Sequence, residues 1–289
     1  MPYPSLIDVD RLAASLDDPA LRLFDATVFL LRPPEGGPYT VKSGRATYEP
    51  EHIPGAAFAD VPGELSDPDS PLNFTLPSAE HFAAGAGRLG IGPENHVVVY
   101  AQDGPMWATR LWWLLRFFGF DDVSVLDGGL SAWRAAGLEL SATPTTHPAA
   151  EFAAAPRPEL MATRADVEQV AGEGGGSSCL INALTPPVFR GEIPTNQTRR
   201  GRIPTSVNAP WTELVDPDTN RFRPPAALER SLAAVGALDA DPVIAYCGGG
   251  IAATVDLFAL SLVGRDDAQL YDGSLSEWTL DPDLPVEVG

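Results

Sequence analysis

Cysteine is scarce in this chain: its 289 residues include only Cys179 and Cys247. Small secreted domains that depend on disulfides use many more, so the sequence does not belong to that class. A structural disulfide would require these two residues to meet, and a reactive cysteine in one of the two positions argues against it. We therefore expect a cytoplasmic protein whose thiols stay reduced.

Basic residues are also few. The chain has 19 Lys and Arg against 39 Asp and Glu, a formal net charge of −20 and a pI near 4.4. A basic patch is the usual mark of nucleic-acid binding, and none is present, so no nucleic-acid partner is expected. The acidic residues are scattered, which indicates a solvated surface that repels its own kind. We expect a monomer or a weak dimer.

Long apolar runs are missing as well. No stretch approaches the roughly 18 residues that suggest a membrane span, so no membrane partner is expected. The first residues, 1–4, show no charged, apolar and small pattern of a secretion signal and lead into helix-like sequence. Hydrophobic residues make up 44% of the chain, enough for a sizeable core.

The chain contains an internal repeat. An apolar strand pattern at 96–104 recurs at 241–249, and each copy is followed by a helical pattern. Upstream and downstream segments correspond as well. These further pairs are 51–58 with 201–210, and 123–133 with 268–278.

The repeat predicts two homologous domains. We place the first at residues 1–142 and the second at 159–289, with a linker rich in Ala, Thr and Pro at 143–158. Short Val, Ile and Leu strands alternate with helical patterns in each copy. This predicts an α/β fold, in which each domain is a mostly parallel sheet with helices on both faces.

Cys247 follows the apolar strand 243–246 and precedes Gly248, Gly249 and Gly250, after which a helical pattern begins near Ala252. Ligand sites in parallel sheets lie at the carboxyl ends of the strands. Glycines can turn successive N–H groups toward one point, and the helix adds the positive end of its dipole. The sequence thus predicts a loop that can hold a thiolate or another anion.

Each cysteine also has a simpler interpretation as a small buried apolar residue. For Cys179, which lies inside an apolar strand, we favour that interpretation. For Cys247, the position between a strand, three glycines and a helix favours a reactive thiol.

Several motifs resemble one family. They are 52–56 (His-Ile-Pro-Gly-Ala), the turns at 126–129 and 271–274, the helices that contain Trp133 and Trp278, and the Cys247 loop. With these marks the chain closely resembles, over nearly its whole length, the two-domain rhodanese-like sulfurtransferases. These enzymes use thiosulfate or 3-mercaptopyruvate. As in that family, only the second copy has the loop cysteine, and Ala101 occupies its place in the first.

The resemblance implies a ping-pong reaction. A donor passes a sulfane sulfur to Cys247, and the resulting persulfide gives it to cyanide or a thiol. It implies no metal and no organic cofactor. The predicted substrate-binding residues are the loop, Gly248, Gly249, Gly250, Ile251 and Ala252, together with His52, which matches the family's histidine. His52 could instead be a polar residue packed at an interface between domains.

The sequence departs from the family in several positions. Thiosulfate users have basic residues after the cysteine, and mercaptopyruvate users have Cys-Gly-Ser-Gly, whose serine is Gly249 here. The anion-binding arginine corresponds to Val188. Four arginines nearby are candidates to replace it, of which we select Arg190 and Arg199; the others are Arg200 and Arg202. Gly248 and Gly250 favour mercaptopyruvate slightly as the donor.

Two other functions compete with sulfur transfer. A cysteine phosphatase would need an arginine six residues after the cysteine, where this chain has Ala253. A non-catalytic module that binds sulfur carriers would explain why substrate-binding positions have changed. The intact cysteine in an open glycine loop favours the enzyme over this module.

Overall fold

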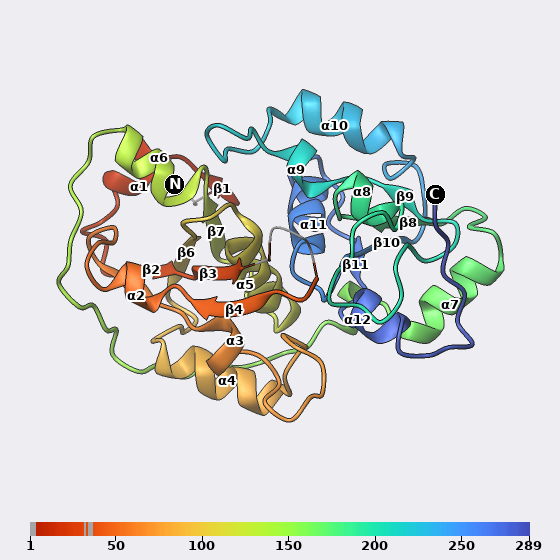
Figure 1. Ribbon diagram of the computed structural model, residues 1–289. Coiled ribbons are helices and arrows are strands. Elements are labelled where there is room, and N and C mark those ends of the chain that lie inside the picture. Colours follow the sequence, from red (N-terminus) through yellow and green to blue (C-terminus); the bar gives the residue numbers. More distant parts are fainter. Residues whose placement is uncertain (1–3, 32, 34–36) are drawn as a thin grey trace.

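The computed structural model describes residues 4–31, 33 and 37–289. The first three residues of the N-terminal segment discussed above lie outside this description. The described chain forms two α/β halves that lie side by side, with the N-terminus in one and the C-terminus in the other (Figure 1). Among the described helices, none has the length and apolar character to cross a membrane.

The first half is built on a five-stranded sheet in the order β1-β7-β6-β2-β5, and every strand pair in it is parallel. Its strands are β1 (Leu6–Ile7), β2 (Leu21–Asp25), β5 (Ala56–Phe58), β6 (His96–Tyr100) and β7 (Val123–Leu126). An antiparallel hairpin, β3 (Val28–Leu31) with β4 (Thr40–Ser43), extends from this half toward the second.

Helices cover both faces of this sheet. Alternate strand residues point to opposite sides, and because the residues on both sides are apolar, both faces must be buried. Val97 and Val99 belong to one apolar cluster, and Val98 and Tyr100 belong to another. The helices of this half are α1 (Val9–Ala13), α2 (Arg45–Tyr48), α3 (Val61–Glu64), α4 (Ala79–Arg88), α5 (Met106–Phe117) and α6 (Gly129–Ala135). The expected parallel sheet with two covered faces is confirmed for this half.

The second half repeats the design with a four-stranded parallel sheet in the order β11-β10-β8-β9. Its strands are β8 (Cys179–Asn182), β9 (Val207–Asn208), β10 (Val243–Tyr246) and β11 (Gln269–Leu270). Its helices are η1 (Pro158–Leu160), α7 (Arg164–Gly172), α8 (Pro186–Phe189), α9 (Trp211–Leu214), α10 (Pro225–Ala234), α11 (Ala253–Leu262) and α12 (Ser274–Trp278).

Equivalent contacts recur in the two halves and support the internal repeat. The Leu130 N–H donates to the carbonyl of Ala101 (3.3 Å), and the Leu275 N–H donates to the carbonyl of Cys247 (3.1 Å). Strand β6 lies between β7 and β2, as β10 lies between β11 and β8. Ala101 therefore occupies in the first half the position of Cys247 in the second.

One apolar cluster continues from the first half into the second. Helices α5 and α11 face each other at its centre (Figure 1). Their side chains meet at a hydrogen bond of 2.8 Å between the hydroxyls of Thr109 and Thr254, and the Trp112 ring packs edge-on against Phe258. The two halves thus share a buried interface.

Between the halves, residues 142–157 carry no helix or strand and lie along the first half. The segment is held by backbone hydrogen bonds, among them Ala150 N–H to the Gly87 carbonyl (2.9 Å) and Ala155 N–H to the Phe118 carbonyl (2.9 Å). This is the part of the chain where a semi-rigid, extended linker is expected from its proline content.

Candidate active site

Cys247 lies directly after β10, at the carboxyl end of its strand, and is 2% exposed. It lines a cavity of about 620 Å³ between the two halves, which we call the Cys247 cavity. The first half supplies Val28, Leu30 and Phe74 to its wall, and the second supplies Trp211. The position that the sequence analysis assigned to the reactive thiol is therefore at a cavity large enough for a small organic molecule.

The loop after Cys247 differs in detail from the sequence expectation, which gave all three glycines the same freedom. Among them only Gly250 has a positive φ, at +76°. A Cβ at Gly250 would lie 2.7 Å from a carboxylate oxygen of Asp272, so this position requires glycine for space as well as for conformation. A Cβ at Gly249 would meet nothing closer than 3.4 Å, the hydroxyl of Ser276.

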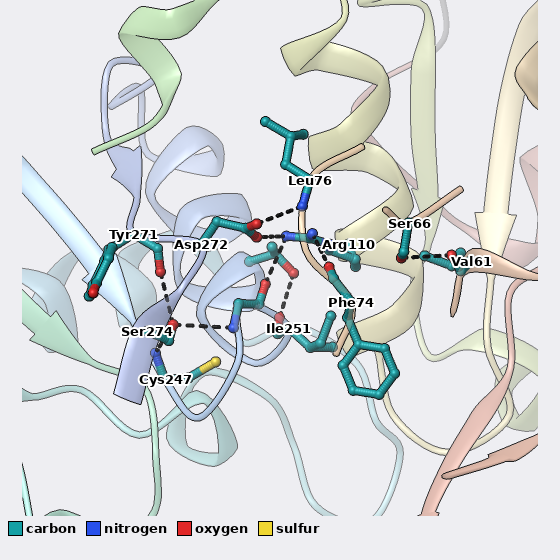
Figure 2. Close-up of polar contacts among 12 residues, drawn as sticks. Val61, Ser66, Phe74, Leu76, Arg110, Cys247, Ile251, Tyr271, Asp272 and Ser274 are labelled. Carbon is teal, nitrogen blue, oxygen red and sulfur yellow. Dashed lines mark hydrogen bonds and ion pairs between the residues drawn. The ribbon is translucent and has the colours of Figure 1, made fainter. Parts of the chain in front are cut away.

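Ser274 fixes the shape of this loop (Figure 2). Its hydroxyl oxygen accepts the N–H of Cys247 (3.0 Å) and the N–H of Gly250 (3.1 Å), and the hydroxyl donates to the carbonyl of Tyr271 (2.9 Å). The side chain is fully buried, and its φ is +50°. Sequence analysis noted the turn at 271–274 only as a family mark and missed this role.

Other loop amides remain available. Among the described residues, no acceptor faces the backbone N–H groups of Gly248, Gly249, Ile251 or Ala252. Helix α11 begins immediately after them, and the Thr254 hydroxyl donates to the Ile251 carbonyl (2.7 Å). Such free amides at a helix N-terminus form a site for an anion.

Arg110 supports the loop from the first half (Figure 2). Its guanidinium is fully buried and donates to the carbonyl of Gly250 (3.2 Å) and to that of Phe74 (2.6 Å). It also forms an ion pair of 2.6 Å with Asp272, whose second carboxylate oxygen accepts the Leu76 N–H (2.7 Å). Sequence analysis missed Arg110. The available signal was a cation in the middle of the apolar helical pattern of residues 106–117, which has a second one, Arg116, near its end.

The structure brings together five of the predicted site residues. Cys247, Gly248, Gly249, Ile251 and Ala252 all line the Cys247 cavity. Gly250 lies on the other side of the loop, against Asp272 and Arg110, and supports the site from behind.

His52 is not at this cavity. It is fully buried, its ring is stacked on Tyr48 with 4.1 Å between ring centroids, and it lines a separate cavity of about 550 Å³ in the first half. Its ring nitrogens lie 2.7 Å from the Tyr48 carbonyl and 3.0 Å from the Thr143 carbonyl. The structure therefore does not bring His52 to the Cys247 cavity, where the sequence analysis expected it to contact the substrate. His52 is a packed residue that ties the segment after α6 to α2.

The two predicted arginines are not at the cavity either. The exposed side chain of Arg190 pairs with Glu192 through bonds of 2.7 and 3.1 Å. Arg199 donates to the backbone carbonyls of four residues, at 2.6 to 3.4 Å: Trp278, Thr279, Asp281 and Leu284. Neither lines the Cys247 cavity, so the structure does not bring these two predicted substrate-binding residues to the loop. Val188 does line the wall, as does Gln197, whose side-chain amide donates to the Gly248 carbonyl (3.1 Å).

Cys179 is separate from the site. Both cysteines are free and buried, and the Cys179 thiol donates to the carbonyl of Val235 at 3.5 Å. Burial raises the pKa of the Cys179 thiol to about 11, which keeps it protonated and unreactive at neutral pH. The described residues contain no group of three or more His, Cys, Asp and Glu side chains suited to a metal ion.

Comparison with known proteins agrees with this architecture. The sequence model of the Rhodanese-like domain matches residues 8–136 and 180–281. The chain is 36% identical to the 3-mercaptopyruvate sulfurtransferase of Escherichia coli K12 over 97% of both chains. It is 37% identical to a probable 3-mercaptopyruvate sulfurtransferase of Pseudomonas aeruginosa over the full length of both.

A solved structure shows the same fold. The crystal structure of the 3-mercaptopyruvate sulfotransferase SseA from Escherichia coli superposes with a TM-score of 0.82 at 34% identity, covering 94% of this chain and 99% of that one. The chain belongs to the rhodanese-like family, and within it to the two-domain sulfurtransferases.

Proposed function

We propose that this sulfurtransferase carries its sulfur on Cys247 and takes it from 3-mercaptopyruvate. The observation that supports the proposal most directly is the position of the thiol. It lines the Cys247 cavity beside amides that have no acceptor among the described residues. The loop amides of Gly248, Gly249, Ile251 and Ala252 then act as the substrate-binding groups.

In the first half-reaction the Cys247 thiolate attacks the sulfur of the donor. A bond forms between the two sulfur atoms, and the carbon–sulfur bond of the donor breaks. The electron pair leaves with pyruvate as its enolate, which takes up a proton. The free amides donate hydrogen bonds to the negative charge before and after the attack, and such preorganised donors lower the barrier. The Cys247 thiolate is thus the nucleophile of a mechanism with a covalent intermediate, the persulfide.

Mercaptopyruvate suits this cavity better than thiosulfate does. Thiosulfate is a compact dianion, and desolvating it requires paired cations. Among the described residues, no Lys, Arg or His side chain lines the Cys247 cavity. Mercaptopyruvate carries one carboxylate on an organic body, so the loop amides and the apolar wall offer it more than they offer a dianion.

The neighbourhood of the loop does not favour a phosphatase. Ala253, six residues after Cys247, is fully buried at the start of α11 and offers no cation for a phosphoryl group.

Mass spectrometry tests the proposal. Wild-type protein exposed to 3-mercaptopyruvate should gain the mass of one sulfur atom on the peptide that contains Cys247, and cyanide should remove it. The matched control is Cys179→Ser, which should gain the sulfur as the wild type does, whereas Cys247→Ser should not. If Cys247 gained no sulfur from 3-mercaptopyruvate or from thiosulfate, the proposal would be overturned and a non-catalytic module would be favoured.

A further inference from the structure

Among the described residues, the walls of the Cys247 cavity are mainly apolar, and their charged side chains are acidic. Besides the loop, the described lining residues are mostly apolar or aromatic, including Leu30, Tyr39, Val188 and Trp211. The charged side chains among them are Asp103 and Glu192; residues 32 and 34–36 lie outside the description. We propose that the acceptor is an organic thiol whose body, the part of the molecule other than its thiol group, is uncharged or cationic, and that anionic thiols react more slowly. This inference rests on the proposed function.

Three nearby arginines of the described chain do not change this balance, because each is engaged elsewhere. Arg190 is paired with Glu192 outside the cavity, and Arg199 is surrounded by backbone carbonyls. Arg110 lies under the loop in its pair with Asp272. Pairing with Arg190 offsets the charge of Glu192, so Asp103 is the carboxylate at the cavity without a partner among the described residues.

Gln197 and Val188 complete this wall. The Gln197 side-chain amide donates to the carbonyl of Gly248 and lies 3.4 Å from the Ser276 hydroxyl, so its donors are directed at the protein. Val188, on α8, presents an apolar side chain. An acceptor that lies against these residues finds no donor for an anionic group.

The chemistry of the acceptor half-reaction explains why the cavity walls determine which acceptor is preferred. The acceptor thiolate attacks the outer sulfur of the protonated persulfide, and a new sulfur–sulfur bond forms. The bond to the Cys247 Sγ breaks, its electron pair stays on Sγ, and the persulfide proton leaves with the acceptor. The loop amides are directed at the Sγ charge that develops, so the body of the acceptor contacts mainly the walls of the cavity.

An anionic body would therefore lose water next to the carboxylate of Asp103, and the described wall offers it only hydroxyl groups, those of Tyr39, Thr185 and Thr195, and no cation. A cationic body would be attracted to that carboxylate and could lie against the rings of Tyr39 and Trp211, which favour cations over their faces. Cyanide is too small to contact these walls and is not subject to this selection.

Three thiols of similar size test the inference: cysteamine, 2-mercaptoethanol and 3-mercaptopropionate, which have a cationic, a neutral and an anionic body. The persulfide form is prepared first and counted by mass spectrometry, and its decay is then followed with each thiol. Rates are corrected for the thiolate fraction of each thiol. Cysteamine should react faster than 3-mercaptopropionate by about tenfold or more, and high salt should reduce the ratio.

Substitutions at the wall provide the second readout. Val188→Arg should move the ratio toward 3-mercaptopropionate, and Val188→Met, which adds length without charge, is its control. Asp103→Asn should lower the cysteamine preference several-fold. If a fully formed persulfide reacts with 3-mercaptopropionate as fast as with cysteamine, the inference fails while the proposed function stands. If no persulfide forms at all, the proposed function itself fails.

Discussion

Arg110 on α5 and Asp272 in the turn before α12 form a buried ion pair of 2.6 Å that joins the two halves of the chain. The same guanidinium donates to the carbonyl of Gly250, three residues from the thiol of Cys247. The half without a loop cysteine therefore contributes a fixed charge to the loop of the other half, and Arg110 is a positioning residue of the site.

Removing one partner of this pair should be costly. Asp272→Ala leaves the Arg110 guanidinium buried without its carboxylate, and uncompensated buried charges of this kind destabilise proteins by about 3–5 kcal/mol. Denaturant unfolding measures the change. The matched control is Arg164→Ala, which breaks the surface pairs with Glu168 and Asp281 and should cost about 0–1 kcal/mol. Equal losses for the two variants would contradict the assigned role of the buried pair.

Ser274 should matter for the reaction rate, because its hydroxyl holds the conformation of the Cys247 loop. Ser274→Ala and Ser274→Gly both remove the oxygen that accepts the amides of Cys247 and Gly250, so both should slow persulfide formation by about tenfold or more. Glycine tolerates the φ of +50° at this position, and Gly129, its counterpart in the first half, has a φ of +55°. The glycine variant should therefore be the more stable of the two, as thermal unfolding would show. A full rate in either variant would refute the role of the hydroxyl.

Gly250→Ala and Gly249→Ala should show which loop glycine is required by the limited space around it and by its backbone conformation. The added Cβ at Gly250 would lie 2.7 Å from Asp272 at a φ of +76°, and we expect a loss of about 2 kcal/mol or more together with most activity. At Gly249 the nearest atom is at 3.4 Å, so the change in stability should stay within about 0.5 kcal/mol. Both are measured by urea unfolding and by steady-state rates. A stable, active Gly250→Ala variant would contradict the described loop.

Asp256 should make stability depend on pH. Its side chain is fully buried in α11 without a hydrogen-bond partner among the described residues, and burial raises its pKa well above the ordinary value of 3.8. The folded chain therefore binds a proton that the unfolded chain has lost. Because the folded state holds more protons, the free energy of unfolding falls as the pH rises above that ordinary value.

Asp256→Asn should remove this dependence. The stability of the wild type relative to the variant should fall by about 1.4 kcal/mol per pH unit above about pH 4, until the folded pKa is passed. Unfolding in urea at a series of pH values measures it. The exposed Asp69→Asn is the control and should follow the wild type. A wild type that gains stability relative to Asp256→Asn as the pH rises would show that the carboxyl is charged in the folded chain.

The strands, the internal repeat and the position of Cys247 were predictable because each depends on local sequence. Short continuous apolar runs form strands that are buried on both faces, and successive residues from Val97 to Val99 lie on opposite faces of the sheet as their order requires. The loop glycines follow a strand and precede a helix, which fixes the edge of the sheet on which they lie.

The contacts of the arginines and of His52 could not be predicted in the same way. Arg199 and His52 are directed by backbone carbonyls of segments far away in the sequence, near residues 279–284 and 143. Arg110 acts on a loop 140 residues downstream. A charged side chain reaches across several ångströms, so its partner depends on tertiary structure rather than on neighbouring residues.

The counterpart of the site in the first half is almost closed. The cavity beside Ala101 measures about 10 Å³ and is also lined by Asn220 from the second half, whereas the Cys247 cavity measures about 620 Å³. A space of that size holds about one water molecule and no sulfur donor. On the proposed chemistry, each chain then loads a single sulfur atom and has no internal relay. Every turnover must deliver that atom to an outside acceptor before the next donor can react.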